Sequence, residues 1–416
     1  MKLLINFFLY SGTEIINKAI PFLLLPLITK YLTPAEYGIY GMYQVLLSFF
    51  VPIFVMNLQT NITRNFFKVS PEKMSRILSS LLLILHIHIF VGLILVYVLT
   101  LLFNNPFNLP SNILYIMPII IYAQTINTFN LTILRNMEKA LQYGTIKIII
   151  TFINYFIVLS MLLFFKEGWI SLVYGAMGSH ILVSLYSFFS LKKSFTLQWK
   201  FYSFKEIYTI SLPLIFHILG GSIISLSDRI FIEEMLNIDK VGLYMIGTQF
   251  GMISAIVINT IMLTLNPWIY KRLSDEDSTM IPKMYLLMVG FLILGILIWL
   301  CSLYIFPYMI DKKFIFAQEV IFWIVMTFVI RGWYQIFFNV IVHEGRTKLF
   351  MYITGVGGVI NLILNYFLIK INGIVGAAQA TLLSYIIIFL LTAYFAIRYS
   401  KLKWIAYFRR GETYDT

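Results

Sequence analysis

The sequence predicts an all-α membrane protein that crosses the bilayer many times, and three observations support this fold class. Of the 416 residues, 60% are hydrophobic and only 12% are charged, and the mean hydropathy is +0.86. A soluble domain usually carries about 25% charged residues, so a soluble fold of this length would lack polar surface. The apolar residues form long continuous runs rather than alternating segments of about ten residues, which excludes a transmembrane β-barrel. The basic residues also gather in alternate loops, as they do in polytopic membrane proteins.

Twelve segments are each long enough to span a bilayer, because a helix of about 20 apolar residues crosses about 30 Å of hydrocarbon. The predicted spans are 5–29, 39–62, 78–102, 113–134, 146–165, 169–191, 207–232, 242–268, 284–306, 318–341, 349–369 and 374–397. The first span is not predicted to be a cleaved signal peptide, since Glu14 and Lys18 interrupt it and no small-residue cleavage site follows.

The basic residues predict the orientation of the chain. When the loops are assigned to alternate sides, 22 of the 31 Lys and Arg residues fall on the side of both termini and 6 on the other. Cytoplasmic loops carry the excess of basic residues, so both termini are predicted to be cytoplasmic. The net charge of +13 is thereby explained by topology and anionic lipid rather than by nucleic acid. The outer loops are too short for an external catalytic domain, and the single cysteine, Cys301, excludes a disulfide framework.

A short repeat predicts that the chain consists of two six-helix halves. Gly38-Ile39-Tyr40 and Gly242-Leu243-Tyr244 lie 204 residues apart, each at the start of the second span of its half. Six spans preserve orientation, so the halves would be parallel repeats, as in some transporters. The predicted organisation is an N-terminal half at 1–193, a cytoplasmic linker at 194–206, a C-terminal half at 207–397 and a basic cytoplasmic tail at 398–416.

Two stretches of the chain also resemble a known family of transporters. They are Tyr31-Leu32-Thr33-Pro34-Ala35-Glu36-Tyr37-Gly38-Ile39-Tyr40, and Asp228-Arg229-Ile230 followed by Val241-Gly242-Leu243-Tyr244. Both are similar to signatures of Wzx-type polysaccharide flippases, which belong to the multidrug/oligosaccharidyl-lipid/polysaccharide exporter superfamily. The resemblance implies a V-shaped transporter that carries an undecaprenyl-pyrophosphate-linked O-antigen or capsular repeat unit to the periplasmic leaflet of the bacterial inner membrane. It also implies a polysaccharide polymerase and a chain-length regulator as partner proteins.

The first span contains two charged residues and two prolines. A charge within the bilayer is costly, so it normally faces a cavity or a partner. Glu14 and Lys18 lie at i and i+4, so they either neutralise each other or line a cavity in which an anionic substrate competes for Lys18. Pro21 and Pro26 follow on the same segment, where proline permits bending. The bend would serve gating or would be an ordinary kink.

Three further charged residues lie well inside predicted spans, away from the span ends. Asp228 and Arg229 are adjacent, so their side chains would point about 100° apart on a helix. Arg229 is a candidate contact for phosphate or sugar, or a member of an interhelical ion pair. Arg331 is the sole charged residue between positions 320 and 342, and its planar donors match a pair of phosphate oxygens. The alternative is a buried ion pair of Arg331 with Glu14 or Asp228.

Other polar residues leave two interpretations open. The second predicted span ends in a polar run at 57–65, in which Arg64 would attract pyrophosphate to a cytoplasmic mouth unless the helix end merely frays. A polar stripe of Gln124, Asn127 and Asn130 could line a cavity or bond to another helix. The sequence contains no cluster of metal ligands and no Walker-type motif, so no cofactor is predicted. Coupling to a proton or sodium gradient is left open.

Three hypotheses follow. The first is the lipid-linked oligosaccharide flippase, which would work by alternating access around a cationic cavity. The second is an ion-coupled multidrug or small-solute exporter of the same superfamily. Such exporters need uncompensated carboxylates within the membrane, whereas Glu14 and Asp228 each have a basic neighbour in the sequence. The third, an enzyme, is disfavoured by the short outer loops, and the chain is predicted not to be an enzyme.

Overall fold

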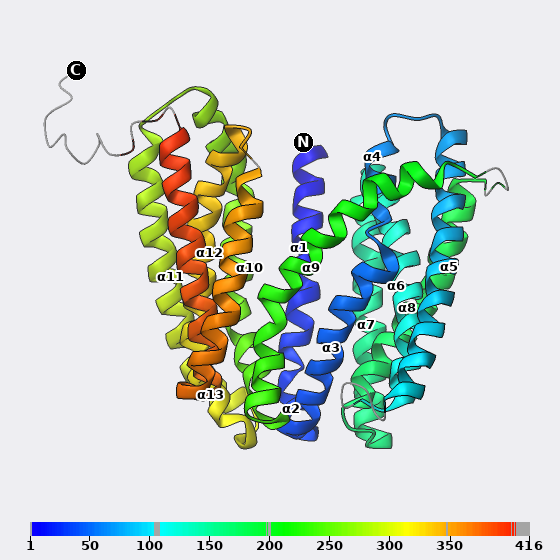
Figure 1. Ribbon diagram of the computed structural model, residues 1–416, viewed down its shortest axis with the longest axis horizontal. Coiled ribbons are helices and arrows are strands. Elements are labelled where there is room, and N and C mark those ends of the chain that lie inside the picture. Colours follow the sequence, from blue (N-terminus) through cyan, green and yellow to red (C-terminus); the bar gives the residue numbers. More distant parts are fainter. Residues whose placement is uncertain are drawn as a thin grey trace, which may run out of the picture. The chain divides into compact units, whose positions relative to one another are not determined.

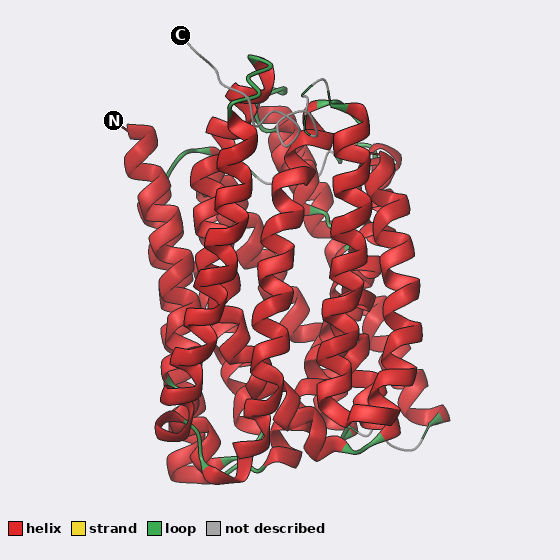
Figure 2. Cartoon of the chain, turned by 90° about the vertical axis from the view of Figure 1, so that its left-hand side faces the viewer, coloured by secondary structure: helices red, strands yellow, loops and turns green. Residues whose placement is uncertain are grey.

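The computed structural model of the chain describes residues 2–103, 109–196, 198, 201–346, 348–400, 402 and 404. These residues are almost entirely helical and contain no β-strand (Figure 2). The elements are α1 (Lys2–Leu23), α2 (Leu25–Tyr31), α3 (Pro34–Val55), α4 (Gln59–Asn65), α5 (Pro71–Leu102), α6 (Ser111–Asn136), α7 (Ala140–Ser160), the π-helical η2 (Met161–Phe165), α8 (Ile170–Ser194), α9 (Phe204–Met235), α10 (Ile238–Ser274), α11 (Met280–Met309), the 3₁₀-helical η3 (Lys312–Ala317), α12 (Gln318–His343) and α13 (Lys348–Tyr399). Most of the predicted basic tail lies outside the described residues.

The prediction of an all-α polytopic membrane protein is confirmed. Among the described residues, ten helices are long and apolar enough to cross a membrane, by length and composition. Helix α13 counts once among them, although Gly373 interrupts it with a φ of +58° and a ψ of −136°. Its two arms cover the predicted spans 349–369 and 374–397, and the 32-residue helix α9 covers 207–232. The number of twelve spans stays a prediction.

The chain forms two compact units, residues 1–222 and 223–416. Their boundary falls inside α9, and the predicted division into halves joined by a linker at 194–206 stays a prediction. The boundary lies inside α9 because the first part of this helix packs within the first unit, where Ser211 accepts a hydrogen bond of 2.8 Å from Asn61 and Tyr208 pairs with His88 at 2.9 Å. The later part of α9 makes its contacts within the second unit, for example from Ser227 to Asn361 at 3.2 Å.

In the first unit, α6 packs against α3, α4, α5, α7 and α8 (Figure 1), and α1 packs along α7. The main apolar core of this unit is built from buried side chains of α3, α4, α5 and α6, among them Ile62, Leu81 and Phe129. Large apolar side chains on α5 point outward instead, with Phe90 and Leu101 exposed by 66% and 67%. Exposed side chains of this kind suit a surface that faces lipid.

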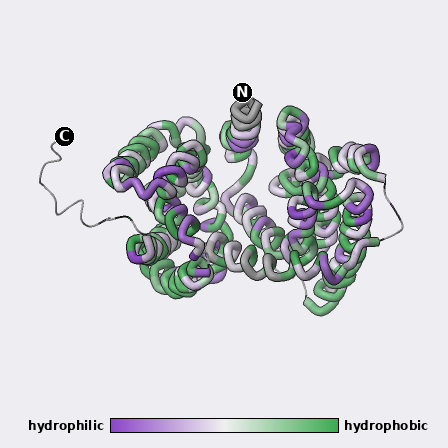
Figure 3. Tube along the Cα trace, turned by 90° about the horizontal axis from the view of Figure 1, so that it is seen from above, coloured by the Kyte–Doolittle hydropathy of each residue, from purple (hydrophilic) through white to green (hydrophobic). Residues whose placement is uncertain are grey.

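In the second unit, α12 packs against α10, α11 and α13 (Figure 1). Gly247 and Gly251 let α10 approach closely, because a Cβ atom at these positions would lie 2.1 Å from Val320 Cγ2 and 2.3 Å from Ile324 Cγ2. Small residues spaced by four are a common means of close helix packing in membranes. Figure 3 shows hydrophobic residues predominating along the helices of both units, with hydrophilic residues interspersed among them.

The residues that carry the family resemblance begin two helices. Thr33 caps α3 by accepting a hydrogen bond from the Glu36 backbone, and the Glu36 carboxylate accepts one from the Thr33 backbone at 2.8 Å. This capping box satisfies backbone donors that a helix start leaves free. In the second unit, Asn237 caps α10 by accepting a hydrogen bond of 3.0 Å from the Lys240 backbone. Both helix starts are therefore capped by a side chain, from Thr33 within the first stretch and from Asn237 just before Val241 of the second.

The second predicted span ends earlier than expected. Helix α3 stops at Val55, where the prediction continues the span to residue 62. Met56 and Asn57 follow in the left-handed conformation, with φ values of 48° and 51°. A left-handed residue ends a helix, and asparagine tolerates this conformation better than most residues. The polar run at 57–65 is therefore divided between this break and the short helix α4.

Candidate functional site

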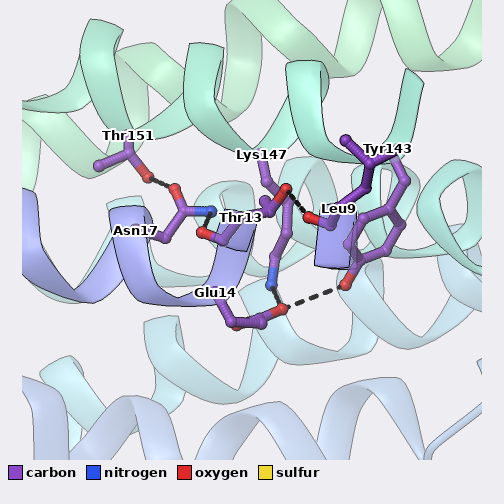
Figure 4. Close-up of polar contacts among 7 residues, drawn as sticks. All are labelled: Leu9, Thr13, Glu14, Asn17, Tyr143, Lys147 and Thr151. Atoms are coloured by element: carbon purple, nitrogen blue, oxygen red, sulfur yellow. Dashed lines mark hydrogen bonds and ion pairs between the residues drawn. The ribbon is translucent and has the colours of Figure 1, made fainter. Parts of the chain in front are cut away.

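A layer of polar side chains joins α1 to α7 in the first unit (Figure 4). Tyr143, Lys147 and Thr151 are spaced by four residues, so they share one face of α7. Lys147 forms an ion pair with Glu14, and Thr151 donates a hydrogen bond of 2.5 Å to Asn17. The hydroxyl of Tyr143 also donates to the Glu14 carboxylate, at 3.4 Å.

Of the two alternatives for Glu14 and Lys18, the structure does not contain the mutual pair. The carboxylate of Glu14 binds Lys147 across the helix contact, and Lys18 is exposed one helical turn away. Helix spacing identified a possible local partner, but the packing of α1 on α7 supplies a nearer one. The side chains of Glu14 and Lys147 keep exposed fractions of 45% and 27%, so the pair is open to a ligand.

The ion pair makes a testable prediction about stability. Glu14→Gln leaves Lys147 without its carboxylate, so we expect the double variant Glu14→Gln/Lys147→Gln to be less destabilised than the sum of the two single variants. A coupling of about 1 kcal/mol is expected for a partly exposed pair, measured by unfolding of the purified protein in detergent. Glu14→Gln/Lys18→Gln is the matched control and should be additive. Coupling in the control but not in the Lys147 double variant would contradict the observed pairing.

The two prolines of the first span flank a break in the helix. Pro21 lies within α1, and Pro26 lies at the start of α2. Leu24, between the two helices, has a φ of −91° and a ψ of −6°. The kink therefore lies where proline was expected to permit one. Its use in gating stays a prediction.

Arg331 lies near the middle of α12 between two aromatic rings. Its guanidinium carbon is 5.1 Å from the ring centroid of Tyr385 on α13 and 5.4 Å from that of Phe328. Among the described residues of its unit, no carboxylate lies within 4.0 Å of the guanidinium nitrogens. The side chain is only partly buried. This geometry leaves the five donors of Arg331 available to an anion.

The two carboxylates that were candidate partners of Arg331, those of Asp228 and Glu14, bond to other residues. Asp228 is buried, with 5% of its surface exposed, and its carboxylate accepts hydrogen bonds from the Tyr244 hydroxyl and, at 2.8 Å, from the Arg229 backbone. Arg229, the next residue, is partly exposed. As expected from their adjacency, the two side chains have different surroundings. Glu14, the other candidate, pairs with Lys147 as described above.

The polar run after α3 divides into buried and exposed parts. Asn61 is buried and ties α4 to α9 through Ser211, whereas Arg64 is exposed at the end of α4. A hydrogen bond to Glu206, together with burial, raises the pKa of the Tyr202 hydroxyl, and the Arg64 guanidinium acts in the opposite direction. Arg64 therefore lies near the loop that precedes α9.

The polar stripe of α6 is mostly used for helix packing. Asn127 and Asn130 are both 1% exposed, and both bond to residues of α8, the former to the His180 backbone at 3.0 Å and the latter to Ser187 at 3.4 Å. Gln124 alone is exposed. The interpretation as interhelical bonding holds for the two asparagines. In the described part of the chain, no group of three or more His, Cys, Asp or Glu residues could hold a metal ion.

The sequence missed several polar residues that the structure brings together. Lys147, the second residue of the predicted span 146–165, was not recognised as a partner of Glu14, but it lies within α7 opposite that residue. In the second unit, Gln335 donates to Asn259 and Asn339 donates to Asn266, both at 2.8 Å. A spacing of four residues from Arg331 to Gln335 and Asn339 was the available signal, since it places all three on one side of α12.

The long apolar helices of the described residues define this chain as a multi-pass membrane protein. Residues 3–273 match the model of the family described as "Polysaccharide biosynthesis protein", and the chain belongs to this family.

Two curated relatives come from Haemophilus influenzae. The "Lsg locus putative protein 1" is 22% identical over 358 residues, which cover 84% of this chain and 87% of that protein. An "Uncharacterized membrane protein" is 24% identical over 282 residues, which cover 66% of this chain and 67% of that protein.

Two solved structures share the fold. A multidrug resistance MATE family transporter of the MOP superfamily, in an inward-facing conformation, has a TM-score of 0.70 and 12% identity, covering 92% of this chain and 95% of its own. The lipid II flippase MurJ, in an inward closed conformation, also has a TM-score of 0.70, with 16% identity and coverages of 93% and 87%. The resemblance to Wzx-type flippases of the exporter superfamily is thereby confirmed, and the family and these neighbours are transporters rather than enzymes.

Proposed function

We propose that this chain flips undecaprenyl-pyrophosphate-linked oligosaccharide repeat units, of the O-antigen or capsular type, from the cytoplasmic to the periplasmic leaflet. The observation that carries the proposal is Arg331, a partly exposed guanidinium near the middle of α12 with no carboxylate partner among the described residues of its unit. A charge at this depth needs an anionic partner or water, and a pyrophosphate supplies two phosphate groups. Membership of a polysaccharide biosynthesis family supports this choice of anion.

Transport would proceed by alternating access around a cationic cavity. Arg64 attracts the head group from the cytoplasm, and Lys18, Arg229 and Arg331 then bind it within the membrane. The prenyl tail stays in lipid throughout, because moving it into water would expose its apolar surface. No covalent chemistry is required, which agrees with a family of transporters.

The proposed setting is the inner membrane of a bacterium, with both termini in the cytoplasm. The excess of basic residues in the predicted cytoplasmic loops supports this orientation. A polysaccharide polymerase and a chain-length regulator are the proposed partner proteins, since they would act on the flipped product at the periplasmic face.

An ion-coupled multidrug or small-solute exporter is the alternative, and the similarity in fold to a MATE transporter supports it. The intramembrane carboxylates count against this alternative. Lys147 neutralises the charge of Glu14, and Asp228 is buried against Tyr244, so neither offers a cationic drug an uncompensated, accessible carboxylate.

The test is to delete the chromosomal copy of this chain and to analyse the lipid-linked saccharides. We expect an undecaprenyl-pyrophosphate-linked oligosaccharide to accumulate on the cytoplasmic side and surface polysaccharide to disappear, with both effects reversed by the wild-type chain. Mass spectrometry of the extracted lipids identifies the intermediate. Unchanged lipid-linked saccharides combined with increased sensitivity to cationic drugs would reject the flippase in favour of the exporter.

A further inference from the structure

Helix α12 carries a row of polar side chains, of which two bond to α10. Arg331, Gln335 and Asn339 follow one another at intervals of four residues. The Gln335 amide donates a hydrogen bond of 2.8 Å to the Asn259 oxygen, and the Asn339 amide donates one of 2.8 Å to the Asn266 oxygen. These two amide pairs therefore continue from Arg331 along the contact of α10 with α12. We call Arg331 and the two pairs the amide row.

Aromatic side chains run beside the amide row, toward α13. Tyr334 and Phe338 lie on the neighbouring positions of α12, with ring centroids 5.6 Å apart, and Phe338 stacks on Phe350 of α13 at 4.2 Å. Tyr385 of α13 lies against the Arg331 guanidinium. Tyr334 and Phe338 are both partly exposed. One side of α12 thus combines a cation, amides and accessible aromatic rings.

The amide row has hydrogen-bonding capacity left over. Within the described residues, no partner is found for Asn259 Nδ2, Asn266 Nδ2 or Gln335 Oε1, and none of these atoms is buried. An amide with free donors and acceptors is costly against hydrocarbon, where no water can satisfy it. Asn127 and Asn130 of the first unit differ from these amides, because they are 1% exposed and serve helix packing. The free atoms of Asn259, Asn266 and Gln335 therefore face water or a polar ligand. Asn339 itself is 5% exposed, and its oxygen accepts a hydrogen bond of 3.2 Å from Tyr270.

We infer that the amide row and its aromatic neighbours bind the saccharide part of the transported lipid, while Arg331 at the end of the row binds its phosphate. The Asn259–Gln335 pair keeps a donor on Asn259 Nδ2 and an acceptor on Gln335 Oε1, which together suit sugar hydroxyls. The apolar faces of sugar rings pack against exposed aromatic rings, whose large surfaces supply most of the contact area. This inference rests on the proposed function and adds the class of group that the second unit recognises: uncharged hydroxylated rings.

The competing explanation is that the amides only tie α10 to α12, as polar residues often do in membranes. The two explanations differ in their consequences for ligand binding. The purified full-length chain is tested with two probes, bare undecaprenyl pyrophosphate and the lipid-linked oligosaccharide extracted from cells that lack this chain. Native mass spectrometry or thermal-shift titration measures both affinities.

We expect the wild-type chain to bind the glycosylated probe about ten-fold more tightly than the bare probe, as several added hydrogen bonds would produce. Gln335→Leu and Asn259→Leu should each lose most of this gain and keep their affinity for the bare probe, which also reports correct folding. The exchange Asn259→Gln/Gln335→Asn retains the bond between the helices but moves the free atoms, and it too should lose the gain. Thr264→Leu is the matched control, because Thr264 is exposed on another side of α10 and bonds to its own helix at 3.0 Å.

Each outcome has a distinct meaning. Variants that bind both probes as the wild type does would overturn the inference and leave the proposed function intact. A wild-type chain that binds neither probe would reject the proposed function itself. If the leucine variants fail to fold, the exchange variant decides, and a full glycan gain in that variant would overturn the inference.

Discussion

Replacing Arg331 by alanine is expected to abolish surface polysaccharide while leaving the amount of protein in the membrane near the wild-type level. Because no carboxylate of its unit is paired with the guanidinium among the described residues, its removal leaves no buried charge uncompensated. What is lost within the protein is the contact with Tyr385 and Phe328, worth about 0.5–2 kcal/mol. What is lost for transport is the bidentate contact with phosphate. Immunoblotting of membranes and staining of surface polysaccharide measure the two effects separately.

Two further variants sharpen this expectation. Arg331→Lys keeps the charge but loses the planar pair of donors, so it should fold normally and transport poorly. Arg346→Ala is the matched control, since Arg346 also lies over an aromatic ring, Tyr399 at 4.6 Å, but is exposed beyond the end of α12. It should keep both abundance and transport. Normal polysaccharide in Arg331→Ala at normal abundance would remove Arg331 from the site, and a large fall in abundance would make it a structural residue.

The fold could be predicted from the sequence because its signals are local. An apolar run of about 20 residues is a helix in a membrane whatever surrounds it. All twelve predicted spans coincide with helices, although the second one ends early. The family signatures were also local, since the first contains the capping pair Thr33 and Glu36 and the second ends in the first turns of α10, just after its cap Asn237. The break after Val55 was missed because its left-handed residues, Met56 and Asn57, are not residue types that clearly predict a helix end.

The candidate site was less predictable because it depends on contacts between distant segments. Helix periodicity could only offer Glu14 a partner on its own helix, and Lys147 is 133 residues away. The amide pairs could not be predicted for the same reason, because Gln335 and Asn259 lie 76 residues apart in the sequence. The isolation of Arg331, by contrast, could be seen in the sequence, because the absence of other charges between 320 and 342 is itself a local property. The structure adds the two rings that flank it.

The second large effect is expected at the glycines that bring α10 close to α12. Gly247→Ala would place a Cβ atom 2.5 Å from the Ala317 carbonyl oxygen as well as against Val320, and backbone cannot move aside as a flexible side chain can. We expect a loss of about 1–3 kcal/mol in stability and a several-fold fall in membrane abundance. Gly251→Ala, which would meet Ile324, should behave similarly. Thermal unfolding in detergent and immunoblotting measure the two quantities.

A glycine-to-alanine substitution should increase stability, rather than lower it, where space is available for the added methyl group. Gly290 lies within α11, and a Cβ atom there would meet nothing within 4 Å, so Gly290→Ala should gain up to about 1 kcal/mol from helix propensity alone. The close approach at Gly247 and Gly251 also sets the distance across which Asn259 reaches Gln335 on the same two helices. Any folded Gly247→Ala protein should therefore lose the tighter binding of the glycosylated lipid along with its stability. A Gly247→Ala chain as stable as the wild type would mean that α10 and α12 are farther apart in the membrane than this packing requires.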